Sequence, residues 1–133
     1  MKRILISSGS PYEKPIGFSR AVRVGNNISV SGTGPIGPDG ATVGVGDAYT
    51  QAKRCLEIIK KAIEDAGGRL EQVTRTRMML TDISQWDKVS RAHGEFFGAI
   101  RPASTLVGVT ALVRPEWLVE IEADCVIDTE KES

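Results

Sequence analysis

Residues 101–127 read RPASTLVGVTALVRPEWLVEIEADCVI and contain the clearest strand pattern of the chain. Over residues 118–127 apolar side chains alternate with acidic ones, which is typical of a strand with one buried face. Alternation places on one face the side chains of Val119, Ile121, Ala123, Cys125 and Ile127. Glu120, Glu122 and Asp124 share the other face, about 7 Å apart along the strand. Because three neighbouring carboxylates repel one another, that face either lies open to water, which periodicity alone favours, or meets cations or a ligand.

Length and charge limit the class of protein. The 133 residues are enough for one domain, which buries roughly two-thirds of its unfolded surface. With 17 basic and 17 acidic side chains the net charge is zero, which argues against a nucleic-acid binder that neutralises many phosphates. No apolar run approaches the ~18 residues of a membrane helix, and the N-terminal apolar stretch is too short for a signal peptide. We therefore expect a cytoplasmic protein.

The cysteines and the histidine do not form a catalytic or metal-binding pattern. Cys55 and Cys125 fall among apolar positions, which favours two reduced, packed thiols over a disulfide. The single histidine, His93, lies on the apolar stripe of a predicted helix, and a hydrogen-bonded core residue is favoured there over a catalyst. One histidine and two distant cysteines do not make a zinc site, so we expect no metal and no cofactor.

Turn and capping residues divide the chain into strands and two helices. The sequence Gly-Asn-Asn at residues 25–27 favours a hairpin because Gly and Asn tolerate positive φ. Asp47 is a good N-cap, and Gly67-Gly68 is a good end, for a helix with apolar residues at three- and four-residue steps. Ser84 with Asp87 resembles a capping box for a second helix. The expected strands are 3–6, 20–24, 28–32, 72–81, 104–112 and 118–127, the expected helices are 47–66 and 84–98, and the expected loops are 7–17 and 33–46.

This element order favours an α+β fold in which residues 1–133 form a single domain. Paired strands with helices between them predict one mixed, mostly antiparallel sheet with both helices packed on one face. The other face is uncovered in a single chain. Alternation places there the side chains of Val73, Arg75, Arg77, Met79, Thr81, Glu120 and Glu122. A mixed charged and apolar face is a poor solvent surface, so we expect other subunits of a homo-oligomer to cover it.

Two further patterns could bind anions. The three arginines Arg75, Arg77 and Arg91 could form an anion site or could neutralise the carboxylates of the last strand, and the second interpretation is favoured. Residues 32–37, GTGPIG, match the GxGxxG string of dinucleotide-binding proteins. That fingerprint needs a helix that begins at once, whereas the nearest predicted helix begins at Asp47. We interpret the match as a false one.

Four segments of the chain resemble the Rid superfamily (RidA or YjgF, the reactive intermediate deaminase proteins, also described as endoribonuclease L-PSP). They are VGNNISVSGTGP at 24–35, DAYTQAKRCLEIIKKAIEDAGG at 47–68, RAHGEFFGAIRPAST at 91–105 and LVEIEADCV at 118–126. The resemblance implies a chorismate-mutase-like α+β fold, the YjgF-like fold, and a homotrimer. The helices would lie outside, the sheets inside, and a small-molecule ligand would bind in each of three clefts between subunits.

The resemblance also implies an activity and site residues. Active members hydrolyse enamines and imines such as 2-aminoacrylate to a keto acid and ammonia. An arginine holds the substrate carboxylate, a glutamate assists a water molecule, and a loop glycine and a tyrosine line the cleft. The glutamate matches Glu120, and the loop pair matches Ser31 and Gly32. If the resemblance holds, the acidic face of this strand is expected to line the cleft and not to lie open to water.

Two positions depart from the pattern of the deaminating members. The arginine would follow Pro102-Ala103 directly, but Ser104 and Thr105 stand there, and the tyrosine position holds Phe18. A charge-assisted hydrogen bond contributes about 1.5–3 kcal/mol, which a neutral serine does not replace. Arg20 or Arg101 could supply the missing charge.

The sequence leaves three functions open. The first is a Rid-like hydrolase or deaminase whose substrate differs from 2-aminoacrylate, with Glu120 as its proton-transfer residue. The second is a trimer that binds a metabolite in a regulatory role without turnover. The third, an endoribonuclease or translation inhibitor, is the weakest, because the net charge is zero and no aromatic-basic motif is present.

Overall fold

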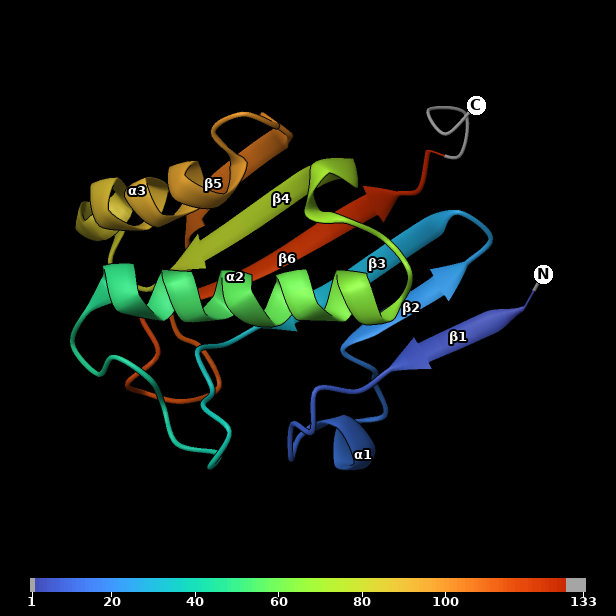
Figure 1. Ribbon diagram of the computed structural model, residues 1–133. Helices are drawn as coiled ribbons and strands as arrows, with labels where there is room; N and C mark the ends of the chain where they lie inside the picture. Colours follow the sequence, from blue (N-terminus) through green and yellow to red (C-terminus); the bar gives the residue numbers. More distant parts are fainter. Residues whose placement is uncertain (1, 129–133) are drawn as a thin grey trace.

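The computed structural model describes residues 2–128, which form one sheet and its covering helices (Figure 1). The strands are β1 (Arg3–Ile6), β2 (Ala21–Val24), β3 (Asn27–Thr33), β4 (Val73–Leu80), β5 (Ala103–Gly108) and β6 (Val119–Val126). The α-helices are α1 (Glu13–Ile16), α2 (Ala48–Asp65) and α3 (Trp86–Phe97), and short 3-10 turns precede β4 and α3. Within this part of the chain, no helix is both long enough and apolar enough to cross a membrane.

The six strands form a mixed sheet in the order β1-β2-β3-β6-β4-β5. All neighbours pair antiparallel except β4 and β5, which are parallel. β6 lies in the centre of the sheet although it is the last strand in chain order. The prediction of a mixed, mostly antiparallel sheet is confirmed.

The two long helices cover one face of the sheet, as predicted (Figure 1). Asp47 caps α2 by accepting a hydrogen bond from the Thr50 backbone N–H at 3.2 Å. The buried stripe of α2 includes Leu56, Ile59 and Ile63, which join the core with Ile121 of β6. Burial of such aliphatic side chains contributes about 1.5–3 kcal/mol each, so the amphipathic stripe seen in the sequence holds α2 against the sheet.

β4 differs from a regular strand at its start. Val73 was expected on the uncovered face with Arg75 and Arg77, but it is 4% exposed and belongs to the core. The pairing between β4 and β6 shifts register between Val73 and Arg75. An extra residue at such a bulge reverses which face the preceding side chains occupy, so strict alternation assigns Val73 to the wrong face.

The start of α3 also differs from the prediction. The expected capping box of Ser84 and Asp87 is wrong. Asp82 accepts hydrogen bonds from the backbone N–H and the hydroxyl of Ser84, at 3.1 and 2.6 Å, and so caps the 3-10 turn Ile83–Gln85. α3 then begins at Trp86 without a side-chain cap.

The segment 7–17, expected as a loop, contains the one-turn helix α1. The Glu13 carboxylate accepts hydrogen bonds from the backbone N–H groups of Ser8 and Ser10 and from the Ser8 hydroxyl, all at 3.1 Å. Burial alone would raise the pKa of Glu13, but bonds from the surrounding serines together hold it below its ordinary value. A polar segment is thereby folded around one buried carboxylate.

Candidate functional site

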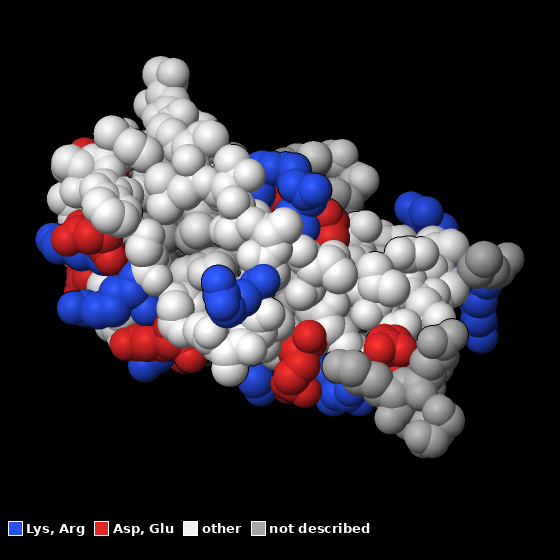
Figure 2. All heavy atoms as spheres, turned by 90° about the horizontal axis from the view of Figure 1, so that it is seen from above, with Lys and Arg blue, Asp and Glu red and all other residues white. Residues whose placement is uncertain are grey.

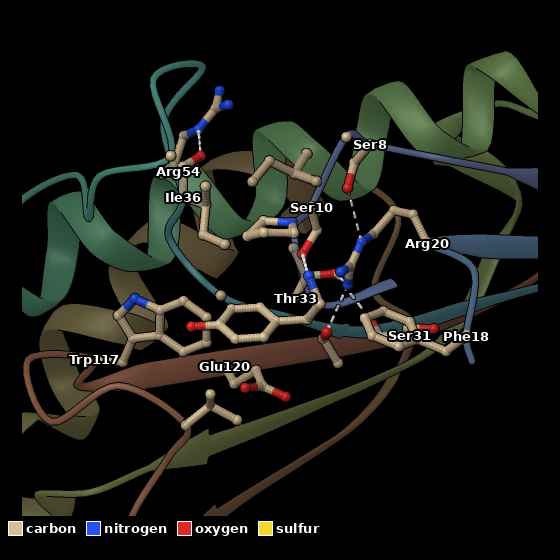
Figure 3. A pocket seen from close by; sticks show the side chains of 18 of the residues that line it. Ser8, Ser10, Phe18, Arg20, Ser31, Thr33, Ile36, Arg54, Trp117 and Glu120 are labelled. Atoms are coloured by element: carbon tan, nitrogen blue, oxygen red, sulfur yellow. Dashed lines mark hydrogen bonds between the residues drawn. The ribbon is translucent and has the colours of Figure 1, made fainter. Parts of the chain in front are cut away.

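A cavity of about 450 Å3 lies where β3 leaves the sheet (Figure 3). Its walls come from the N-terminal segment, from β3, α2 and β6, and from the two loops that contain Gly37 and Val113. Five of the residues singled out in the sequence line it, namely Phe18, Arg20, Ser31, Gly32 and Glu120. The structure therefore brings together most of the candidate site from three separate segments of the chain.

Glu120 is the carboxylate of this cavity. It stands on β6, on the face away from the helices, and points into the cavity (Figure 3). Burial raises the pKa of Glu120; Arg20 lowers it in part, and Glu122 raises it. The backbone of Gly32 passes so close that a Cβ there would collide with the Glu120 carboxylate. No hydrogen bond to that carboxylate is formed by the residues the structure describes, so it faces the cavity unpaired.

Arg20 is the buried cation of the cavity, at 5% exposed. Its Nη1 donates to the Gly32 carbonyl at 2.6 Å and to the Thr33 hydroxyl at 3.0 Å, and its Nε donates to the Ser8 hydroxyl at 3.2 Å. Its guanidinium carbon lies 5.3 Å from the centre of the Phe18 ring. Burial lowers the pKa of Arg20, and the charges of Glu13 and Glu120 oppose that shift. These bonds fix the cation beside Glu120 (Figure 3).

One wall of the cavity is aromatic and is held in place by polar contacts. The Trp117 indole N–H donates to the Thr42 hydroxyl at 3.0 Å, and a Cβ at Gly34 would collide with the Trp117 ring. Tyr12 meets this ring edge-on at 6.4 Å between centres. Arg114 donates to the Tyr12 hydroxyl at 3.0 Å and lies 5.4 Å from the Trp117 ring. The sequence does not single out Tyr12 or Trp117 as site residues, because no local pattern places either beside Glu120.

Arg101, Ser104 and Thr105 do not line this cavity in the single chain. They belong to β5 and the turn before it, at one edge of the sheet. The Ser104 hydroxyl is 2.8 Å from the Thr76 hydroxyl, which is 2.8 Å from Nε2 of His93. Burial lowers the pKa of His93. The prediction that His93 is hydrogen-bonded is confirmed, although the residue is half-buried and not part of the core. The site roles of the other three residues stay predictions.

The other two outward acidic residues of β6 form ion pairs with arginines of β4. Arg77 forms an ion pair with Glu122, and Arg75 Nε lies 3.9 Å from an oxygen of Asp124. These pairs confirm the prediction for Arg75 and Arg77. The prediction is wrong for Arg91, which lies over the Tyr49 ring at 4.1 Å from its centre instead of on the last strand. Among the three outward acids, Glu120 is the one directed to the cavity instead.

Two further predictions from the sequence are confirmed. Cys55 and Cys125 are buried free thiols, and burial raises the pKa of Cys125 to about 11, so the cysteine is an inert packed group. Residues 34–37 continue from β3 into a long loop, and the next helix begins only at Ala48. The GxGxxG string therefore lacks the helix that the fingerprint needs.

Figure 2 shows the charges on the face of the molecule seen from above. Basic and acidic side chains of the described residues lie next to each other on that face.

Comparison with known proteins assigns the chain to a family. The family model described as Endoribonuclease L-PSP matches residues 12–127. A RutC family protein of Pyrococcus abyssi is 37% identical over 92% of this chain and 94% of its own length. The 3-aminoacrylate deaminase RutC of Acinetobacter baylyi is 35% identical over 90% of this chain and 94% of its own length.

Solved structures agree with this assignment. A member of the YjgF/YER057c/UK114 family from Mycobacterium tuberculosis has a TM-score of 0.85 at 43% identity, covering 95% of this chain and all of the other. The YjgF protein of E. coli has a TM-score of 0.82 at 27% identity, covering 94% of this chain and 99% of its own. The chain thus has the YjgF fold and belongs to the endoribonuclease L-PSP family, a part of the Rid (RidA/YjgF) superfamily.

Proposed function

We propose that this protein hydrolyses a small imine, or the enamine that tautomerises to it, to a carbonyl compound and ammonia. The observation that carries the proposal is the Glu120 carboxylate, which faces the cavity without a hydrogen-bond partner among the described residues and has a raised pKa. A carboxylate whose pKa lies closer to neutrality exchanges protons more readily at physiological pH. The curated relative named 3-aminoacrylate deaminase supports the same reaction class.

The reaction requires few groups. Glu120 accepts a proton from a water molecule while the oxygen of that water bonds to the imine carbon. The carbon–nitrogen double bond becomes single, and Glu120 passes that proton to the nitrogen, which gives a carbinolamine. Glu120 then accepts the proton of the new hydroxyl group and passes it to the nitrogen, the carbon–nitrogen bond breaks, and ammonia leaves as the carbonyl forms. Because the imine carbon is already electrophilic, positioning and one proton-transfer group are sufficient.

Arg20 serves as a positioning residue in this scheme. Its three hydrogen bonds hold the β3 carbonyl and the Thr33 side chain against the cavity. Its charge favours the ionised form of Glu120 and so opposes the effect of burial. Arg20 thus holds the pKa of Glu120 below the value that burial alone would give it.

We further propose a homotrimer in the cytoplasm, in which β5 of a neighbouring subunit approaches this cavity and brings Ser104 and Thr105 to it. The uncovered sheet face, with its partly exposed Met79 and Val107, supports such an assembly. The hydroxyl of Ser104 offers a neutral hydrogen bond where deaminating relatives carry arginine. The substrate then differs from 2-aminoacrylate.

The test is ammonia release from 2-aminoacrylate generated in the assay, with the natural protein, Ser104→Arg, and Ser104→Arg combined with Glu120→Ala. We expect the natural protein to be slow, Ser104→Arg to gain at least tenfold, and the double variant to lose that gain. If adding Glu120→Ala to Ser104→Arg leaves turnover unchanged, Glu120 has no catalytic role. A ligand that raises Tm without any product from any imine would instead indicate a binding protein.

A further inference from the structure

We infer that the cavity takes an uncharged imine with an aromatic or large branched apolar substituent, which packs against Trp117 while the imine carbon faces Glu120. This inference names the substrate class of the proposed hydrolase and therefore rests on that proposed function. It depends on the size of the cavity, on the hydrogen bonds of its cations and on the fixed position of its aromatic wall.

The cavity is larger than a three-carbon imine requires. Its volume of about 450 Å3 falls within the ~300–1,000 Å3 of pockets that hold drug-sized ligands. Away from Glu120 and Arg20 the lining is mainly apolar and includes Phe18, Ile36, Ile58, Val113 and Trp117. A substituent that fills this region removes apolar surface from water, at about 25 cal/mol per Å2. A three-carbon substrate does not cover this region, so it gains none of that free energy.

The cations of the cavity are poorly placed to hold a carboxylate. Arg20 has five N–H groups, and the single one on Nε and both on Nη1 already donate to protein acceptors. Only Nη2 remains, which cannot provide the two-nitrogen fork that grips a carboxylate. Arg54 donates from Nε to the Ile36 carbonyl at 2.7 Å, and its Nη1 lies 3.6 Å from Glu57. The unpaired Glu120 would moreover repel an anion, so an uncharged head group fits better.

The aromatic wall is held in its position before any ligand arrives. Trp117 is 4% exposed and is fixed by its bond to Thr42, by the close backbone of Gly34 and by the Arg114 cation. A ring that is already ordered loses little conformational entropy when a ligand packs on it. The indole therefore selects flat or branched apolar groups by contact.

Four stable compounds test the ligand class without any catalysis. Phenylacetamide, phenylacetate, acetamide and acetate differ only in the ring and in the charge, and the amide resembles an uncharged imine. Trp117 fluorescence reports binding in a Trp86→Phe background, because Trp86 is 57% exposed and lies outside the cavity. We expect phenylacetamide to bind at least tenfold more tightly than either acetamide or phenylacetate. Equal or tighter binding of phenylacetate, equal binding of acetamide, or no binding of phenylacetamide would each overturn the inference.

Variants of the wall give matched controls. Val113 lines the cavity and Val45 does not, and both are loop valines at 63% and 69% exposed. Calorimetry should show that Val113→Asp weakens phenylacetamide binding at least fivefold whereas Val45→Asp has no effect. Equal effects of the two substitutions contradict a cavity site.

Hydrolysis separates this inference from the proposed function. Flavin-dependent oxidases generate uncharged imines from 2-phenylethylamine and ethylamine, and carboxylated imines from phenylalanine and alanine, with semicarbazide trapping the imine that survives. We expect the protein to reduce trapping most for the imine of 2-phenylethylamine. If phenylacetamide binds as expected but no imine is hydrolysed, the proposed function fails and the ligand class stands. If only the small or carboxylated imines are hydrolysed, the function stands and the ligand class is wrong.

Discussion

The position of Glu120 in the cavity carries a cost in stability. Its pKa is raised by burial, so the folded chain binds the proton more tightly than the unfolded chain does. At pH values above the folded pKa, the ionised carboxylate therefore reduces the free energy of unfolding. Such opposition between stability and activity is common at catalytic groups, which is the role proposed for Glu120.

Replacing Glu120 by Gln should remove turnover and raise Tm at pH 7. The natural protein should lose activity as pH falls through the raised pKa, with a midpoint above the ordinary 4.5 of the carboxyl group. Activity against pH and thermal unfolding at pH 7 measure these effects. An acid limb below 4.5, or a lowered Tm for the variant at pH 7, would contradict this account.

Gly32 is required by the approach of the β3 backbone to Glu120, since a Cβ would collide with the carboxylate. Gly32→Ala should displace that carboxylate and reduce activity at least tenfold, with the fold retained. The matched control is Gly94→Ala in α3, where a Cβ meets nothing within 4 Å. This control should stabilise the protein by about 0.5–1 kcal/mol, since alanine replaces glycine within a helix. Urea unfolding and activity assays of both variants distinguish the two glycines.

At the scale of elements, one hydrogen-bonded chain joins α3, β4 and β5. It runs from His93 through Thr76 to Ser104. Because burial lowers the pKa of His93, the folded protein prefers the neutral imidazole, whereas the unfolded chain takes up a proton near pH 6.5. Stability from this group is therefore present above about pH 6.5 and is lost as pH falls below it.

The free energy of unfolding should accordingly decline between about pH 7 and pH 5 in the natural protein, and less steeply in His93→Gln. Glu120, whose pKa is raised, acts on stability in the opposite sense as pH falls, so the difference between the natural protein and His93→Gln isolates the imidazole contribution of His93. Because it is the single histidine, its imidazole resonances in an NMR titration report its pKa directly. A midpoint at or above 6.5 in the folded protein would show that this account is wrong.

The elements and the cavity were predictable to different degrees. Asp47 and the apolar stripe of α2 are local signals, and they located that helix to within a residue. The bulge at Val73 arises from the pairing of β4 with β6. The periodicity of a single strand carries no information about that pairing. The aromatic wall is less predictable still, since Tyr12, Arg114 and Trp117 meet only in three dimensions. Family resemblance pointed to Glu120 and Gly32 as site residues. The neighbours that shift the pKa of Glu120 could be identified only from the fold.

At the scale of the whole molecule, the uncovered sheet face predicts assembly. Sedimentation equilibrium should give three chain masses. Val107, 40% exposed on β5, pairs with Met79 and shares its face, so Val107→Glu should place an unpaired charge in the proposed interface and yield monomers. Lys53→Glu on the exposed side of α2 is the control and should remain trimeric. A natural protein that sediments as a monomer would contradict the proposed assembly.

The central position of β6 has a consequence for biosynthesis. β3 and β4 both pair with β6, yet the ribosome finishes β3 long before it begins β6. At about 5–20 residues per second, roughly 4 to 17 seconds pass between these two moments. Until β6 is made, the facing edge of β3, and that of β4 once it has been made, have no native neighbour on a nascent chain, and unpaired edges invite wrong pairing. The sheet and the Glu120 cavity can therefore be completed only after β6 has been made.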